Sequence, residues 1–128
     1  MSKGTSIGRV RGLGPAHDGA HHWLVQRFTA VGNLVLMIWL GASLVALPDL
    51  GFETVSKWLA APIPATAMIL LVVSTFWHAR LGLQVLVEDY VHEAGSKFGA
   101  LVLLNLAAIG GAAFGIFAVA RLALSGAA

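Results

Sequence analysis

The sequence predicts an all-α membrane protein with three transmembrane helices. Of its 128 residues 58% are hydrophobic and only 11% are charged, whereas soluble globular domains contain about 25% charged residues. The chain also contains three long stretches without an ionisable side chain, and each comes close to the ~20 residues that cross a hydrocarbon core about 30 Å thick. These observations predict a single membrane domain over residues 1–128 and argue against a soluble enzyme.

Charge and cysteine content restrict the remaining possibilities. Eight basic residues against six acidic ones give a net charge of +2, and the basic residues form no dense run, so we expect no nucleic-acid partner. The lack of cysteine excludes disulfides, thiolate zinc sites, c-type haem attachment and iron–sulfur ligation by this chain. Any metal chemistry must therefore use histidine or carboxylate ligands.

The first expected span covers residues 28–47, with the sequence FTAVGNLVLMIWLGASLVAL. It follows a mostly polar segment, residues 1–27, and it is longer than the apolar region of about 7–15 residues in a cleavable signal peptide. We therefore expect the first helix to be retained in the mature protein.

The second charge-free stretch covers residues 58–77, and the second span is expected over residues 65–88. The third span is expected over residues 98–120. Pro62 and Pro64 precede the second span. Because proline is favoured at helix starts and disfavoured inside helices, the helix proper is expected to begin near Ala65.

Two glycines in the third span have a spacing typical of helix contacts. Gly111 and Gly115 form a small-xxx-small pair, with Ala107 one turn earlier on the same face. Such a pair lets another helix approach closely. Glycine and alanine are also common in membrane helices in general, and this alternative stays open.

The charge distribution predicts the orientation. Before the first span only Asp18 is acidic, whereas the first loop contains two acidic residues and one lysine. By the positive-inside rule the N-terminus and residues 1–27 are expected to be cytoplasmic and the C-terminus to lie on the opposite side. The basic residues of the N-terminal segment are Lys3, Arg9, Arg11 and Arg27.

An ionisable side chain lies within the second expected span. His78 opens the segment HARLGLQVLVEDYVH and lies about 15 Å from the cytoplasmic end of the span, near the middle of the bilayer. Intramembrane ionisable residues indicate functional sites. Ser74 and Gly82 flank the histidine by one turn on either side, which leaves a flat groove for a porphyrin ring. A histidine hydrogen-bonded to a neighbouring helix is the alternative.

A haem at His78 would require a ligand from elsewhere. His17, His21, His22 and His92 all lie outside the expected spans. A six-coordinate haem iron would therefore take its second axial ligand from another chain or from a methionine. The sequence thus predicts a partner subunit or a homodimer.

Asp89 and Tyr90 lie at the expected cytoplasmic end of the second span. Asp89 follows His78 by eleven residues, which places it about 20° from the same helix face and about 16 Å further along. A tyrosine hydroxyl beside a carboxylate can donate to a carbonyl oxygen and pass on a proton, as quinone reduction requires. An interfacial anchor is the alternative, and spacing alone favours it.

Other polar residues near this site have less specific patterns. Arg80 points about 200° away from His78 around the helix and can snorkel or pair with a partner's carboxylate; its role is unassigned. His21, His22 and Arg27 gather at the expected cytoplasmic edge. An arginine fork suits haem propionates, but positive-inside anchoring explains these residues without a haem and is favoured on the residues alone.

Two of these motifs together resemble a known family. The segment HARLGLQVLVEDYVH, with His-x3-Gly and an Asp-Tyr pair, resembles the second helix of the small (D-type) hydrophobic membrane anchor of succinate dehydrogenase. The entry segment HHWLVQRFTAVGN is similar to that family's His-x5-Arg-x-Thr-Ala stretch. The three-span plan and the chain length also fit.

The resemblance implies a function and partners. The family's anchor pairs with a larger cytochrome b anchor, and the two dock a flavoprotein and an iron–sulfur subunit. Electrons from succinate pass from FAD through iron–sulfur clusters, all in partner subunits, to ubiquinone in the respiratory chain. For this chain it implies a multi-pass protein of the bacterial inner membrane, without a catalytic residue of its own.

The resemblance also implies residue roles. His78 matches the axial ligand of haem b, and Arg27 and His21 match positions near the haem propionates. Tyr90 matches the tyrosine that hydrogen-bonds the quinone carbonyl, and Asp89 matches the aspartate beside it.

Two alternatives remain. One is the equivalent subunit of a fumarate reductase, which runs the reverse reaction. The other is a non-redox small membrane protein with a buried histidine.

Overall fold

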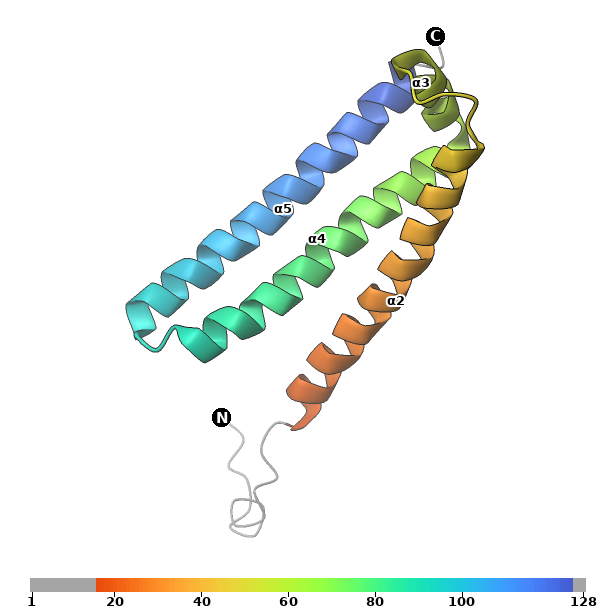
Figure 1. Cartoon of the computed structure of the whole chain (residues 1–128). Helices are drawn as coiled ribbons and strands as arrows, with labels where there is room; N and C mark the ends of the chain where they lie inside the picture. The colour runs from red at the N-terminus through yellow and green to blue at the C-terminus, as the bar shows by residue number, and fades with distance from the viewer. Residues whose placement is uncertain (1–15, 126–128) are drawn as a thin grey trace.

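The computed structural model describes residues 16–125, which form four α-helices. Three of the helices are long and apolar enough to cross a membrane, and they alternate in direction along the chain (Figure 1). The predicted all-α architecture with three membrane-spanning helices is thereby confirmed. The helices are α2 (Ala16–Ala46), the short α3 (Phe52–Ala60), α4 (Pro62–Tyr90) and α5 (Ala94–Ser125).

The described chain begins at one end of the bundle and finishes at the other (Figure 1). Which end faces the cytoplasm stays a prediction, because the positive-inside argument depends mainly on Lys3, Arg9 and Arg11. These three residues lie outside the described part of the chain.

The long helices extend beyond the expected spans. α2 begins at Ala16 rather than at Phe28, and α4 begins at Pro62 rather than at Ala65. A charge-free stretch marks the part of a helix that can lie in hydrocarbon, but the backbone continues as helix through the polar residues at either end. Pro62 fits the first turn of α4 because the N–H groups of that turn have no intrahelical partner.

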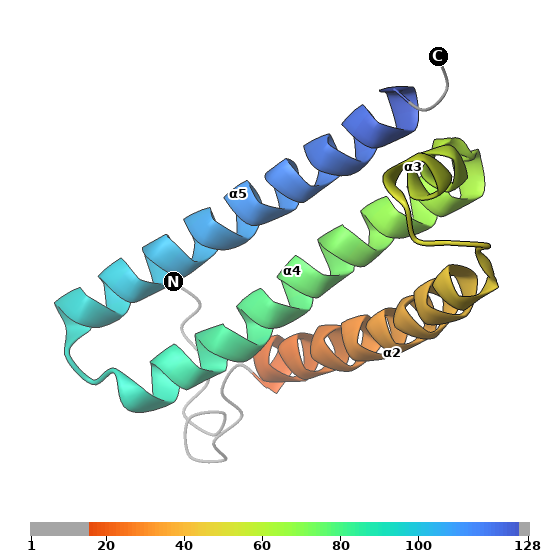
Figure 2. The ribbon, with the colours of Figure 1, turned by 45° about the horizontal axis from the view of Figure 1, so that its top comes forward.

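Helix α4 lies between α2 and α5, which do not contact each other within the described residues (Figures 1 and 2). The Gly111–Gly115 pair of α5 lies against Phe76 and Val72 of α4. A Cβ atom on Gly115 would lie only 2.7 Å from Cγ1 of Val72. The close approach expected from the glycine spacing therefore occurs within this chain, between α4 and α5.

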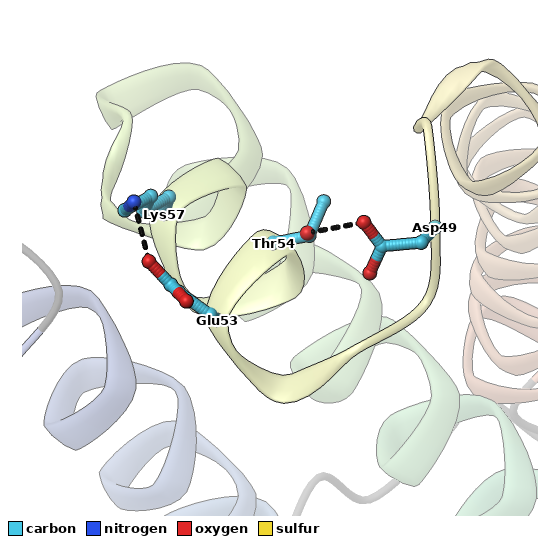
Figure 3. Close-up of polar contacts among 4 residues, drawn as sticks. All are labelled: Asp49, Glu53, Thr54 and Lys57. Carbon is cyan, nitrogen blue, oxygen red and sulfur yellow. Dashed lines mark hydrogen bonds and ion pairs between the residues drawn. The ribbon is translucent and has the colours of Figure 1, made fainter.

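Helix α3 was not expected from the sequence. Asp49 organises its start by accepting hydrogen bonds from the Gly51 N–H (2.7 Å) and the Thr54 hydroxyl (2.8 Å), and Lys57 pairs with Glu53 at 2.7 Å (Figure 3). The hydrogen bonds to Asp49 and the ion pair at Glu53 lower the pKa values of both carboxyls. These local contacts stabilise a short helix at one end of the bundle.

Few side chains are buried in the described chain. The buried apolar side chains of the described residues are those of Leu59, Pro64, Leu71, Leu81 and Val119. Large apolar side chains are exposed along all three long helices, and α2 buries nothing in its most apolar stretch. Such surfaces are stable only against lipid or another protein, so the described chain is a multi-pass membrane protein with room for partner helices.

Candidate functional site

The intramembrane histidine of α4 is hydrogen-bonded to α2. Nδ1 of His78 lies 3.0 Å from the hydroxyl oxygen of Thr29. The Ser74 hydroxyl, one turn away on α4, donates to the Thr29 carbonyl at 3.5 Å. Gly32 of α2 faces that serine, and a Cβ atom there would lie in ordinary contact, 3.7 Å from its hydroxyl oxygen. Small and hydroxylated residues thus allow α2 and α4 to approach at the level of the histidine.

The hydrogen bonds of Thr29 are compatible with a proton on Nδ1 of His78. The threonine hydroxyl lies 2.9 Å from the Val25 carbonyl and 3.1 Å from the Gln26 carbonyl, and it donates its one proton to these backbone acceptors. With its proton on a backbone carbonyl, the hydroxyl oxygen can accept a hydrogen bond from Nδ1–H of His78. When Nδ1 carries the proton, the lone pair of Nε2 remains available. Second-shell hydrogen bonds fix this tautomer in histidine metal ligands.

A cavity of about 720 Å³ lies beside His78 between α2 and α4. Gly82 lines this cavity. A Cβ atom added at Gly82 would contact one neighbouring atom, the side-chain amide nitrogen of Gln26 at 3.5 Å. Two polar atoms of the cavity residues, Nε2 of His22 and Oε1 of Gln26, are buried without a hydrogen-bond partner among the described residues. The cavity therefore combines apolar walls with polar atoms that a bound molecule could satisfy.

The structure brings some of the predicted site residues together. Arg27 and His78 line the same cavity. His22 lines this cavity and also an adjoining one, whereas His21 lines the adjoining cavity and not the one beside His78. α2 is already helical at these positions, so successive residues point about 100° apart and only one of the two histidines reaches the His78 cavity.

Asp89 and Tyr90 lie at the end of α4 and are exposed, Tyr90 by 76%. The residue of this end that lines the His78 cavity is Glu88. The carboxylate of Glu88 accepts a hydrogen bond from the Gln84 side chain at 2.9 Å, and its backbone carbonyl accepts one from Lys97 at 3.1 Å. The predicted quinone residues thus lie about 16–18 Å along α4 from the histidine, and both are exposed in this chain.

Sequence reasoning did not assign roles to Thr29 and Gln26. Their spacing could have indicated a shared role, because Gln26 and Thr29 follow His22 by four and seven residues and therefore lie on the same face of α2. Their partners on α4 follow in the sequence by about fifty positions, however, and only the relative placement of the two helices identifies them. The described residues contain no group of three or more histidine, cysteine, aspartate or glutamate side chains that could hold a metal ion.

The fold and the site together define a class: a small polytopic membrane protein with a histidine in a membrane-spanning helix beside a cavity between two helices. A model of the succinate dehydrogenase/fumarate reductase transmembrane subunit family matches residues 1–113. The chain belongs to this family, which confirms the resemblance seen in the sequence.

Individual relatives agree with this assignment. The succinate dehydrogenase hydrophobic membrane anchor subunit of Rickettsia bellii is 33% identical over 85 residues, which cover 66% of this chain and 68% of the relative. The protein of the same name from Rickettsia conorii is 31% identical over 86 residues, with the same coverage. A succinate dehydrogenase membrane anchor subunit from Reclinomonas americana is 27% identical over 72% of this chain and 79% of its own length.

Proposed function

We propose that this chain is the membrane anchor subunit of a succinate dehydrogenase and that it helps to bind haem b and ubiquinone. The observation that carries the proposal is the hydrogen bond between Thr29 and His78 beside a cavity of about 720 Å³. It leaves Nε2 of an intramembrane histidine available as a ligand. The family assignment supports the same function.

The residues of the cavity fit a haem. His78 would be one axial ligand, and the second would come from the partner anchor, as the family resemblance implies. Gly82 leaves the cavity wall flat beside the ligand. When bound, the haem supplies a one-electron redox centre.

The cationic end of the same cavity fits the haem propionates. Arg27 would hold a propionate with its guanidinium fork, and its guanidinium carbon lies 5.2 Å from the centre of the Trp23 ring, which orients it. The resemblance assigns a second propionate contact to His21. His22 shares the cavity with Arg27, whereas His21 does not, so the geometry favours His22 for that contact.

The exposed end of α4 suits a quinone site shared with partner subunits. The Tyr90 hydroxyl would donate a hydrogen bond to a quinone carbonyl oxygen, and the neighbouring Asp89 carboxylate would hold a proton for the reduced oxygen. Both side chains are exposed, as a site completed by another chain requires.

The proposal includes three partner subunits: a cytochrome b anchor, an iron–sulfur subunit and a flavoprotein. FAD and the iron–sulfur clusters would reside in the partners. We place the complex in a bacterial inner membrane, with the end of the bundle that carries Tyr90 facing the cytoplasm. Relatives named as succinate dehydrogenase subunits favour succinate oxidation over fumarate reduction.

The decisive experiment is affinity purification of the tagged chain from its native membranes. We expect a flavoprotein, an iron–sulfur protein and a second membrane anchor to co-purify, together with a b-type absorbance spectrum. The His78→Ala complex should lose this spectrum, whereas His92→Ala, outside the cavity, should retain it. A chain that purifies alone would contradict the function, and an unchanged spectrum in the His78 variant would remove His78 as the ligand.

A further inference from the structure

Arg80 is a charged residue inside a membrane helix, and the proposed function does not use it. At 1.5 Å per residue α4 is about 43 Å long, about 13 Å longer than a typical hydrocarbon core. If both ends share this excess, Arg80 lies about 9 Å inside the core from the Tyr90 end. A charge at that depth is unfavourable unless an anion or a strong dipole accompanies it.

The contacts of Arg80 within this chain are neutral. Its Nε donates a hydrogen bond to the side-chain oxygen of Asn105 on α5, and its guanidinium carbon lies 5.7 Å from the centre of the Trp77 ring. Asn105 is held in place because its amide nitrogen donates to the Leu101 carbonyl at 2.7 Å. Over residues 16–125 the one ion pair joins Lys57 and Glu53, at the other end of the bundle. The described residues therefore place no carboxylate beside Arg80 to compensate its positive charge.

A groove of about 500 Å³ between α4 and α5 begins at this arginine. Its polar end consists of Arg80, Asn105 and Trp77. Because α4 and α5 are antiparallel, the groove residues with lower numbers on α4 and higher numbers on α5 lie progressively further from the Tyr90 end. These residues are apolar: Val73, Phe76, Ala108, Ile109, Ala112 and Ile116. The groove is thus polar at one end and apolar along the rest.

We propose that this groove binds an anionic phospholipid, with its phosphodiester at Arg80 and an acyl chain along the apolar part. A lipid in the leaflet at the Tyr90 end has its headgroup toward that end and its chains toward the bilayer centre, which is the polarity of the groove. The free N–H groups of the guanidinium match phosphate oxygens in geometry and charge. Snorkelling and local thinning of the bilayer close the remaining gap between the arginine and the headgroup layer.

A carboxylate on a partner helix is the competing source of negative charge. It would neutralise Arg80 but would leave the apolar length of the groove without a specific occupant. A lipid accounts for both ends of the groove at once. The proposal does not depend on the redox function, because it concerns the α4–α5 face and not the α2–α4 cavity.

The test uses the protein with its native partner chains, extracted with its surrounding lipid in polymer nanodiscs. Bound phospholipids are quantified by mass spectrometry after exchange into detergent. Arg80→Gln removes the charge, and Arg121→Gln, an exposed arginine near the end of α5, is the matched control. We expect anionic phospholipid to be retained about tenfold less well in Arg80→Gln, as loss of a charge-assisted phosphate contact implies, and to be unchanged in Arg121→Gln.

A second variant tests the apolar part of the groove. Ala112→Leu fills the groove but keeps Arg80, so it should also lower lipid retention. Equal retention in the wild type and Arg80→Gln, or full retention in Ala112→Leu, would overturn the proposal. If the Arg80→Gln variant loses a partner subunit but retains the lipid, the proposal is also overturned. The partner of Arg80 would then be a carboxylate on that subunit.

The wild-type protein gives an answer even if a variant fails to assemble. After delipidation, added phosphatidylglycerol should raise its melting temperature, and added phosphatidylcholine should raise it much less. Equal shifts with the two lipids would overturn the proposal.

Discussion

The hydroxyl oxygen of Thr29 lies 3.0 Å from Nδ1 of His78 and joins α2 to α4 inside the membrane-spanning region. The sequence left two interpretations of this histidine open, a hydrogen bond to a neighbouring helix or a ligand role. The geometry shows that the hydrogen bond exists and that it occupies only one ring nitrogen. The two interpretations are therefore compatible, because the hydrogen bond at Nδ1 orients Nε2 for a ligand.

Removing the Thr29 hydroxyl should weaken the site without changing its shape. Thr29→Val removes the partner of Nδ1 of His78, and for this part-buried contact we expect a cost of about 1 kcal/mol. We expect lower thermal stability and less haem per purified complex, measured by calorimetry and by absorbance. Thr66→Val, at an exposed position of α4, is the control. Equal haem content in both variants would show that the hydrogen bond has no part in cofactor binding.

The two adjacent histidines of α2 should behave differently. His22 lines the cavity beside His78, and its Nε2 is buried there without a partner among residues 16–125, whereas His21 faces the adjoining cavity. His22→Ala should therefore lower haem affinity by about tenfold, the lower range for loss of an outer-shell contact. His21→Ala should have a smaller effect. A larger loss in the His21 variant, read from haem titrations, would favour the family alignment over this geometry.

Tyr90 should affect quinone reduction alone. Tyr90→Phe removes one hydrogen-bond donor at an exposed position, and we expect ubiquinone reduction to fall by about tenfold, as the loss of about 1.4 kcal/mol implies. Succinate-dependent reduction of an artificial dye should be unchanged, because the dye takes electrons before the quinone site. Normal quinone turnover in the variant would leave Tyr90 as an interfacial anchor.

The packing of α5 on α4 gives a prediction with an internal control. Gly115→Val would place a side chain against Val72, only 2.7 Å from the first added carbon. We expect destabilisation of about 1–3 kcal/mol from this overpacking. Gly110→Val introduces the same side chain where nothing lies within 4 Å and should change stability little. Val72→Ala should partly rescue the Gly115 variant in thermal unfolding.

Helix α3 should loosen at low pH. The hydrogen bonds from Thr54 and Gly51 hold the pKa of Asp49 below its usual value of 3.8. A carboxyl whose pKa is lowered by folding stabilises the folded state at pH values above its usual pKa. This stabilisation is lost as the pH falls through the lowered pKa. Glu53, whose pKa is lowered by Lys57, acts in the same direction.

Hydrogen exchange of the α3 amides, corrected for intrinsic rates, measures this effect. Exchange should accelerate between pH 5 and pH 2.5 in the wild type. Asp49→Asn should exchange faster at pH 5 and should respond less to acid. A pH-independent wild-type rate would contradict the assigned role of Asp49.

The short α3 shows what local sequence signals fail to reveal. Its residues were expected to form a loop, because no long apolar run marks them and the orientation argument used only their charges. In the structure Trp58 of α3 stacks on Trp39 of α2, with ring centroids 5.7 Å apart. That contact, together with the buried Ser56 and Leu59, holds a helix that is too short to be stable alone.

The sequence by itself determined the three spans, the intramembrane position of His78 and the close approach made possible by Gly111 and Gly115. These features depend on composition and on spacing along one helix, because hydrocarbon accepts only long apolar helices whose backbone groups are paired internally. The family also followed from motifs within single segments, and the match over residues 1–113 confirmed it.

Only the tertiary structure decided which residues meet across helices. Thr29 as the partner of His78, His22 in place of His21 in the cavity, and Asn105 beside Arg80 all depend on the relative rotation and register of separate helices. Helix periodicity says which residues share a face but not which face meets which neighbour. Side-chain packing between distant segments sets that choice, and here small and hydroxylated residues on α2, α4 and α5 allow the contacts.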